Sequence, residues 1–286
     1  MRLTRVETVA EFMAQAGPFL MEHEDEHNLM LGLCATLRRQ PEVYPEGAYL
    51  AYVSAGDAVI TAALRTPPHG ITLARVAGGA DAAAAHALLA ADLRARYGSL
   101  PGAGGRADVA RSFAEAWHTA TGASYLLKLP QYFYRLDHLL PPPPVAGALR
   151  RATEADRPLL ERWIVAFTDE AEGSGQHMDA ARWVTNALSF DTRGLYLWED
   201  GAVVALAGWS GPTEHGVRIG PVYTPPERRR RGYAGACVAA LSQALLDEGH
   251  DFCVLYTDAT NPTPNHVYQQ LGYQRILEAS FYTFGA

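Results

Sequence analysis

The residues best suited to chemistry lie in a loop rich in arginine and glycine that follows an apolar segment. Residues 220–236 read GPVYTPPERRRRGYAGA, with arginines at Arg228–Arg231 and glycines at Gly232 and Gly235. A helix that begins after such a loop presents unpaired backbone N–H groups, which carry roughly half a positive charge between them. Because small residues let an anion approach this backbone closely, the loop is predicted to bind a diphosphate.

A second polar segment, residues 261–273, follows a predicted buried strand and reads NPTPNHVYQQLGY. Thr263 is predicted to cap a short helix with Pro264 in its first turn, and Gly272 suits a left-handed helix end. Tyr268 lies on the apolar face of this helix. A phenol at this position could donate a proton or a hydrogen bond to a leaving group.

Together, the two segments resemble the GNAT superfamily of acyltransferases. The pattern Arg229-x-x-Gly232-x-Ala234 matches the loop by which that superfamily is recognised, and the second segment has the family's asparagine, tyrosine helix and glycine-aromatic pair in order. The resemblance implies an acetyl-CoA cofactor and transfer of acetyl to a primary amine of a small molecule or peptide, in one ternary complex. It implies that these residues hold coenzyme A: Val222, Tyr223, Thr224, Arg229, Arg231, Gly232, Tyr233, Ala234 and Asn261. Arg230 stands where the family usually has glycine.

The same resemblance implies that Tyr268 is the acid for the departing thiolate. An alkyl amine of pKa about 10.4 is almost entirely protonated at pH 7, so desolvation or a general base must help it react. Glu170 is the predicted base, because it lies in the expected acceptor-side loop between the first two helices of the second half. Glu172 and the pair Glu214 and His215 are alternatives. No metal is predicted in this site.

The elements that must position these residues occupy the second half of the chain. Four prolines at 141–144 predict a stiff connector. We therefore expect a domain over 1–140 and an acetyltransferase domain over 145–286. In the second domain, two helices should precede a hairpin that turns at 200–201, and a strand should lead into the arginine loop.

The first half is predicted to share this plan, because a predicted hairpin over 49–64 and a helix over 82–97 follow the same order. Residues 77–81 read AGGAD and contain no basic residue where a diphosphate would lie. The predicted fold class is therefore α/β, with two tandem GNAT-like domains, each a mixed, mostly antiparallel central sheet flanked by helices. The first copy is predicted to be degenerate and structural in role.

Composition restricts the class of protein further. The chain has 286 residues, 48% of them hydrophobic, which is enough for two ordinary cores. A net charge of −7 argues against a nucleic-acid partner. No apolar run approaches the roughly 20 residues of a membrane helix, so we expect a cytoplasmic protein without a membrane partner, as monomer or homodimer. The cysteines at 34, 237 and 253 are predicted core thiols.

Two other functions compete with acetyl transfer. A non-catalytic coenzyme A sensor or scaffold would keep the loop without turnover. Residues 23–27 read HEDEH, which matches the H-E-x-x-H pattern of zinc peptidases. The middle positions are acidic here and no third ligand is evident downstream, so zinc is the least favoured alternative.

Overall fold

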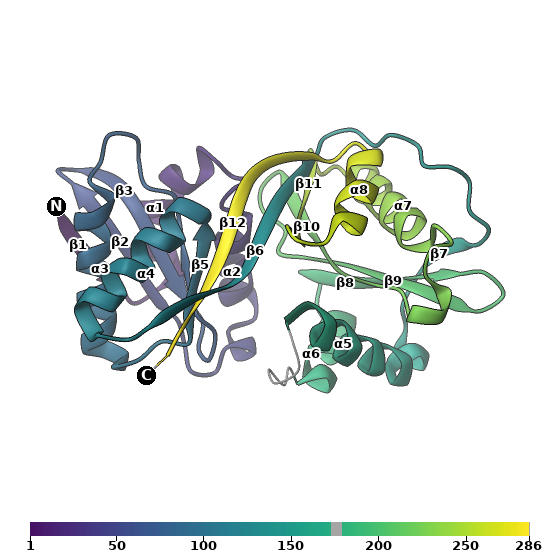
Figure 1. The fold of residues 1–286 in the computed structure, drawn as a ribbon, viewed down its shortest axis with the longest axis horizontal. Helices are drawn as coiled ribbons and strands as arrows, with labels where there is room; N and C mark the ends of the chain where they lie inside the picture. Colours follow the sequence, from purple (N-terminus) through teal and green to yellow (C-terminus); the bar gives the residue numbers. More distant parts are fainter. Residues whose placement is uncertain (173–178, 286) are drawn as a thin grey trace. The chain divides into compact units, whose positions relative to one another are not determined.

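The computed structural model describes residues 1–172 and 179–285. It divides into two compact units (Figure 1). Unit 1 comprises Met1–Tyr132 with Leu277–Ala286, and unit 2 comprises Phe133–Ile276. The predicted domains of 1–140 and 145–286 place the whole last strand in the second half, whereas the end of that strand lies in unit 1.

Unit 1 has strands in the order β1-β2-β3-β4-β5-β12, in which β4 and β5 pair in parallel and the other neighbouring pairs among the described residues are antiparallel. The elements of the first half are β1 (Arg2–Val6), α1 (Val9–Met21), α2 (Asn28–Arg39), η1 (Pro41–Val43), β2 (Tyr49–Ala55), β3 (Ala58–Arg65), β4 (Ile71–Leu73), α3 (Ala82–Tyr97), β5 (Gly102–Arg106), α4 (Ala107–Thr121) and β6 (Tyr125–Leu136).

The two faces of this sheet carry separate cores, because successive strand residues point to opposite faces. In β2, Tyr49, Ala51 and Val53 pack with α3 and α4. Leu50 and Tyr52 instead pack with α1 and α2. The strand is therefore buried on both faces, and it reads as a continuous apolar run.

Unit 2 has the strand order β6-β11-β10-β9-β8-β7. Helices α5 and α6 cover one face, and α7 and α8 cover the other (Figure 1). The elements of the second half are β7 (Ala148–Arg151), η2 (Glu154–Asp156), α5 (Arg157–Glu172), α6 (Ala180–Ser189), β8 (Arg193–Glu199), β9 (Val203–Ser210), β10 (Gly216–Tyr223), η3 (Pro226–Arg228), α7 (Tyr233–Asp247), β11 (Phe252–Asp258), α8 (Pro262–Gln270) and β12 (Gln274–Phe284).

The two halves repeat one order of helices and strands, which confirms the predicted tandem α/β fold. In each, a strand and two helices precede three strands, a helix, a strand, a second helix and a last strand. In each half, the last helix, α4 or α8, is followed by a glycine with positive φ: Gly122 at 78° and Gly272 at 96°. A Cβ at Gly272 would also lie 2.9 Å from the His138 carbonyl oxygen, so this turn requires glycine.

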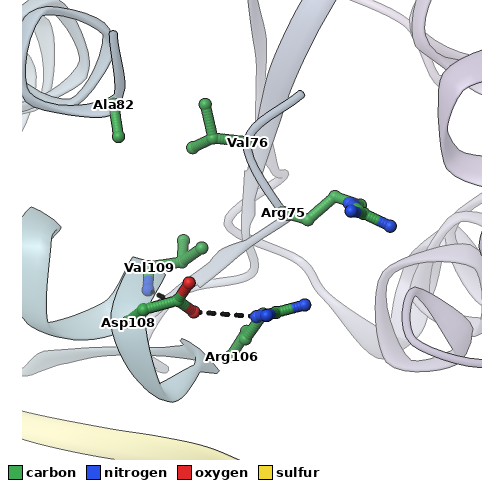
Figure 2. Close-up of a pocket in the computed structure, with 6 residues that line it drawn as sticks. All are labelled: Arg75, Val76, Ala82, Arg106, Asp108 and Val109. Carbon is green, nitrogen blue, oxygen red and sulfur yellow. Dashed lines mark hydrogen bonds and ion pairs between the residues drawn. The ribbon is translucent and has the colours of Figure 1, made fainter. Parts of the chain in front are cut away.

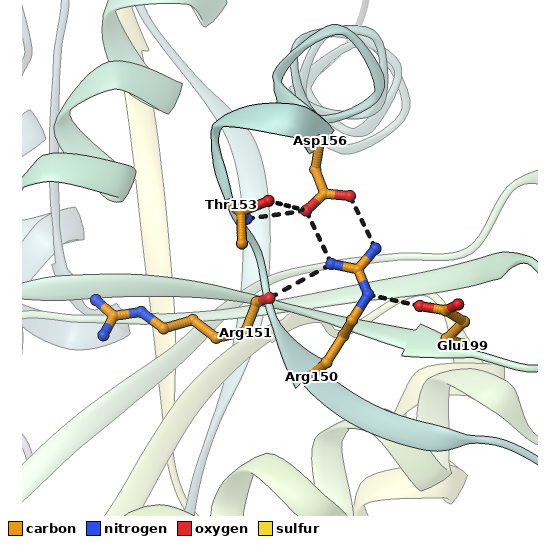
Figure 3. A network of polar contacts seen from close by, with 5 residues as sticks. All are labelled: Arg150, Arg151, Thr153, Asp156 and Glu199. Carbon is orange, nitrogen blue, oxygen red and sulfur yellow. Dashed lines mark hydrogen bonds and ion pairs between the residues drawn. The ribbon is translucent and has the colours of Figure 1, made fainter.

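An ion-pair network fastens the start of α5 to the sheet of unit 2 (Figure 3). The Arg150 guanidinium donates two hydrogen bonds of 2.8 Å to Asp156, and its Nε donates to Glu199. Asp156 also accepts from the backbone N–H of Thr153 at 2.9 Å. These bonds, led by the one from Arg150, lower the pKa of Asp156 to about 2. The network thereby fixes the helix that carries Glu170.

The three cysteines are buried and unpaired, as predicted. Burial raises the pKa of each thiol to about 12, so these side chains are inert core residues. In residues 1–172 and 179–285, no helix combines the length and the apolarity needed to cross a membrane.

Candidate functional site

The arginine loop leaves the sheet of unit 2 at an irregular part of β10. This strand pairs with β11 in parallel over Gly216–Arg218, and its register against β9 shifts between Ile219 and Val222. Such a bulge leaves backbone groups without ladder partners and bends the strand. The bulge lies next to Val222, one of the predicted cofactor residues.

The loop ends at the N-terminus of α7. Gly232 is the N-cap with φ of 81°, and no side chain in the described part of the chain caps the helix. A Cβ at Gly235 would lie 3.3 Å from Val267, so a larger residue would crowd α8. Tyr233 and Ala234 form the first turn. The uncapped N–H groups of this turn are therefore available to an anion.

Thr224 is the second place in the loop with a polar group that has no partner. Its side chain is buried, and its Oγ1 has no hydrogen-bond partner among the described residues. An unsatisfied buried hydroxyl costs about 1–3 kcal/mol, so a native structure should supply it with a partner. A bound ligand in this loop could be that partner. Tyr223, the preceding residue, is buried and its ring packs on Trp163 of α5, with centroids 5.7 Å apart.

Arg229 is the best-fixed arginine of the loop. Its Nε donates to the Thr224 carbonyl oxygen at 2.8 Å, and its guanidinium lies 5.9 Å from the Tyr223 ring centroid. Its Nη2 donates to both carboxylate oxygens of Glu170, at 2.7 Å each. The predicted cofactor residue and the predicted base are thus bound to each other. Both side chains are partly exposed, at 41% and 49%.

The neighbouring loop residues differ in conformation. Arg230 has φ of 61°, in the left-handed region that glycine tolerates best. Arg230 therefore has a backbone conformation that favours glycine, at the position where the GNAT pattern usually has glycine. Arg231 is exposed. The Tyr233 hydroxyl donates to Asp200 at 2.7 Å, which ties the start of α7 to the hairpin between β8 and β9.

Tyr268 lies in α8 and is buried, with 8% of its surface exposed. Its ring contacts Tyr134 and Tyr273, at centroid distances of 6.5 and 5.8 Å. No described residue hydrogen-bonds its hydroxyl. Burial raises the pKa of Tyr268 to about 12. Proton transfer from such a phenol to a thiolate of pKa about 8.5 is uphill by about 5 kcal/mol, so hydrogen-bond donation suits this group better.

The cap of α8 differs from the prediction. Asn261, not Thr263, is the N-cap, and its Oδ1 accepts from the Thr263 N–H at 3.2 Å. Pro262 takes the first helical position that was predicted for Pro264. The sequence contains two polar residues that are each followed by proline, and local preference does not distinguish them. Asn265 favours Asn261 as the cap, because its Nδ2 donates to the Asn261 carbonyl oxygen.

Asn265 was missed in the sequence. Its Nδ2 donates to the carbonyl oxygens of Asp258 and Asn261, at 2.9 and 2.6 Å. Its Oδ1 accepts from the Tyr134 hydroxyl at 3.1 Å. The side chain therefore fixes the turn between β11 and α8, and with it the backbone on which Tyr268 is carried. In the sequence, the only indication of this role is that Asn265 lies in the segment NPTPN, which is typical of a turn.

The alternative bases are not among the described contacts of this cluster. Glu214 is exposed, next to His215, in the turn before β10. The His215 carbonyl oxygen accepts from the Asp251 N–H at 2.7 Å. The Glu172 side chain lies outside the described residues. Of the predicted candidates, the structure brings together Glu170, Arg229, Tyr223 and Thr224.

The HEDEH segment forms a turn between α1 and α2 rather than one face of a helix. His27 is buried; its Nδ1 lies 2.8 Å from the Leu20 carbonyl oxygen, and its Nε2 accepts from the Arg75 N–H at 3.2 Å. Burial lowers the pKa of His27 to about 4, so the ring is neutral and structural. Within the described ranges, no three His, Cys, Asp or Glu side chains are grouped to hold a metal ion.

Comparisons with known proteins concern the second half and the whole fold. Residues 194–282 match the family model described as FR47-like protein. A Drosophila protein of known structure is similar, with a TM-score of 0.68, 14% identity and coverage of 98% of this chain and 97% of that one. A tandem GNAT protein from the clavulanic acid biosynthesis pathway has a TM-score of 0.61, 16% identity and coverage of 99% and 98%.

A GCN5-related N-acetyltransferase from Kribbella flavida is also similar, with a TM-score of 0.56, 18% identity and coverage of 81% of this chain and 88% of that one. The search for similar curated proteins found no match. At these identities, the likeness to solved structures concerns the fold.

Proposed function

Because this chain has the tandem GNAT fold, we propose that unit 2 is an acetyl-CoA-dependent N-acetyltransferase acting on a primary amine of a small molecule or peptide. The observation that carries the proposal is the open cradle at α7. An uncapped helix N-terminus, the unsatisfied Thr224 hydroxyl and the Arg229 guanidinium lie in one loop. Together they fit a diphosphate.

In this proposal, the residues around the N-terminus of α7 bind the cofactor through different groups. Gly232, Tyr233 and Ala234 offer backbone N–H groups, while Arg229 and Arg231 offer charge. Thr224 offers its hydroxyl. Val222 and Tyr223 lie along the bulged strand, and Asn261 at the start of α8. When bound, acetyl-CoA supplies an activated acetyl thioester.

Two further residues act on protons. Glu170 accepts the proton of the acceptor ammonium once it has separated from Arg229. Tyr268 donates a hydrogen bond to the departing thiolate, since its raised pKa disfavours full proton transfer. Acetyl transfer is direct, in one ternary complex.

We extend this proposal to the two domains of the chain. The catalytic part is the predicted 145–286 domain, and the 1–140 domain is a degenerate copy without a coenzyme A loop. In that copy the Asp81 side chain accepts from the Ala84 N–H at 3.0 Å, so α3 has a cap where α7 has none. We propose a cytoplasmic monomer or homodimer without nucleic-acid or membrane partners.

Calorimetry of acetyl-CoA with the full chain tests the cradle. We expect binding that weakens at least about tenfold in Arg229→Ala, since a hydrogen bond to a charged group contributes roughly 1.5–3 kcal/mol. Arg162→Ala, which removes an exposed arginine of α5, is the control and should bind normally. Absence of binding in the unmodified chain would remove the basis of the proposal.

Turnover distinguishes the enzyme from a non-catalytic coenzyme A sensor. The positive φ of Arg230 favours the sensor as second candidate, because an altered loop geometry can keep cofactor binding without turnover. Release of free thiol from acetyl-CoA in the presence of a panel of primary amines supports the enzyme. Tight binding without release from any amine supports the sensor.

A further inference from the structure

Unit 1 contains a pocket of its own, and we propose that it binds a short-chain monocarboxylate. Its volume is about 190 Å³. Three of its lining residues are charged and three are apolar (Figure 2): Arg75, Val76, Ala82, Arg106, Asp108 and Val109. The proposal does not depend on the function of unit 2.

The fold places the pocket at the carboxyl ends of two parallel strands. β4 and β5 pair at Ile71 with Ala103 and at Thr72 with Gly104. After β4 the chain no longer pairs with β5, and the Ala77 N–H instead donates to the Ile60 carbonyl oxygen of β3 at 2.8 Å. This end of parallel strands is where α/β sheets present residues to ligands.

The side chain of Arg75 is available to an anion. Its Nη1 lies 3.9 Å from Glu26 Oε2, which is too long for a hydrogen bond. No described residue accepts a hydrogen bond from its guanidinium. The backbone of Arg75 is nevertheless fixed, since its N–H donates to His27 Nε2. The Arg75 guanidinium is thus ion-paired with Glu26 but keeps N–H groups that no described residue accepts, and these groups can donate to a bound anion.

Arg106 supplies the second positive charge. It is the last residue of β5, and its Nε donates to Asp108 Oδ1 at 2.9 Å. The same oxygen accepts from the Val109 N–H at 3.0 Å, so Asp108 holds Arg106 against the start of α4. Figure 2 shows the guanidinium groups of Arg75 and Arg106 extending to the same side. Planar guanidinium groups bind carboxylates through paired N–H donors.

The size of the pocket limits the ligand. A volume of about 190 Å³ is below the roughly 300 Å³ at which drug-sized sites begin, so the lined space suits a small ligand. The Asp81 cap on α3 also engages the Ala84 N–H, one of the helix N-terminal groups that would otherwise be open to a diphosphate.

The charge and the walls favour a monocarboxylate over inorganic phosphate. Asp108 lines the pocket and Glu26 lies next to Arg75, so a dianion meets more repulsion than a monoanion. Val76, Ala82 and Val109 form an apolar wall that a hydrocarbon chain can cover but phosphate cannot. A carboxylate head against the arginines with a chain of about three to five carbons satisfies both features.

Saturation-transfer NMR on the full chain tests the proposal, with sodium butyrate as the probe. We expect saturable butyrate binding, weakened at least about tenfold in Arg75→Gln, which removes the charge. Ala82→Leu fills the pocket and should abolish binding. Arg111→Gln is the matched control, because Arg111 is an exposed arginine of α4 that lies outside the lining, and it should bind as the unmodified chain does. Circular dichroism confirms that each variant is folded.

Competition with other probes fixes the chemistry. Butanol at the same concentration should not bind, and inorganic phosphate should bind more weakly than butyrate. Saturating acetyl-CoA should leave butyrate binding unchanged. Stronger binding of phosphate, displacement by acetyl-CoA, or unchanged butyrate affinity in Arg75→Gln and Ala82→Leu would each overturn the assignment.

Discussion

Arg229 and Glu170 bind each other, at 2.7 Å from Arg229 Nη2 to each carboxylate oxygen of Glu170. They are 59 residues apart in the chain, and each has a different proposed task. A diphosphate at the loop would compete with Glu170 for this guanidinium. Binding of acetyl-CoA then also frees Glu170, the proposed base, from Arg229. Acetyl-CoA should therefore bind before the amine.

This competition predicts that Glu170→Gln binds acetyl-CoA more tightly than the unmodified chain. A partly exposed ion pair contributes about 0.2–1 kcal/mol, so the gain should be up to about fivefold in Kd. The same variant should lose turnover because it lacks the base. Calorimetry and steady-state rates measure the two effects separately.

Asp169→Asn is the matched control for this prediction. Asp169 is the exposed neighbour of Glu170 in α5, and the same charge is removed there without touching the pair. It should change neither the affinity nor the rate. An equal gain in affinity in both variants would show that the general negative charge of the helix, and not the pair with Arg229, opposes the cofactor.

The sequence predicted the elements around the site better than the contacts within it. Gly272 after α8 was identified correctly as a left-handed helix end, because such a backbone turn restricts the residue type locally. The pairing of Arg229 with Glu170 joins distant segments and has no local pattern. The error at Thr263 has the same origin, since Asn265 selects Asn261 as the cap through bonds that form only in the folded turn.

The strand exchange between the halves was also not predicted. The sequence placed one complete copy on each side of the four prolines at 141–144, whereas the end of β12 pairs with β5 at Ala279–Thr283. Strand pairing between distant segments depends on which sheet edge is open in the folded units. The sequence of β12, QRILEASFYTF, has no regular alternation of apolar and polar residues, so it contains no signal for the partner.

Tyr268→Phe should lower kcat strongly while acetyl-CoA affinity changes little. Removal of one hydrogen-bond donor to a developing charge typically costs about 10²–10³ in rate. Because burial raises the pKa of Tyr268 to about 12, ionisation of this group should not appear as a loss of kcat below pH 10. A pH–rate profile of the unmodified chain checks the second statement. A rate in Tyr268→Phe equal to that of the unmodified chain would exclude the role.

Arg230→Gly should stabilise unit 2 slightly. A non-glycine residue at φ of 61° is strained by roughly 1–2 kcal/mol, and the added flexibility of glycine in the unfolded chain offsets about half of that. Chemical denaturation should therefore show a gain of about 0.5–1 kcal/mol. Arg231→Gly, at an exposed neighbour without positive φ, should instead be destabilising. A loss of stability in Arg230→Gly would mean that the side chain makes contacts that outweigh the strain.

Asp156→Asn should destabilise unit 2 in a pH-dependent way. The Arg150 pair lowers the pKa of Asp156 from 3.8 to about 2, so the folded protein releases this proton more readily than the unfolded chain. The resulting stability is present in full above about pH 4 and is lost as pH falls through 2. Arg150 is 36% exposed, so we discount the gain to about 1–2 kcal/mol. Denaturation of Asp156→Asn and of the unmodified chain between pH 7 and 2 checks this prediction. The difference between their free energies of unfolding should shrink from pH 4 to pH 2.

Glu154→Gln is the control, because it breaks an exposed pair with Arg157. Its free energy of unfolding should differ little from that of the unmodified chain at any pH. A difference between Asp156→Asn and the unmodified chain that stays constant down to pH 2 would mean that Asp156 acts through packing and not through its charge.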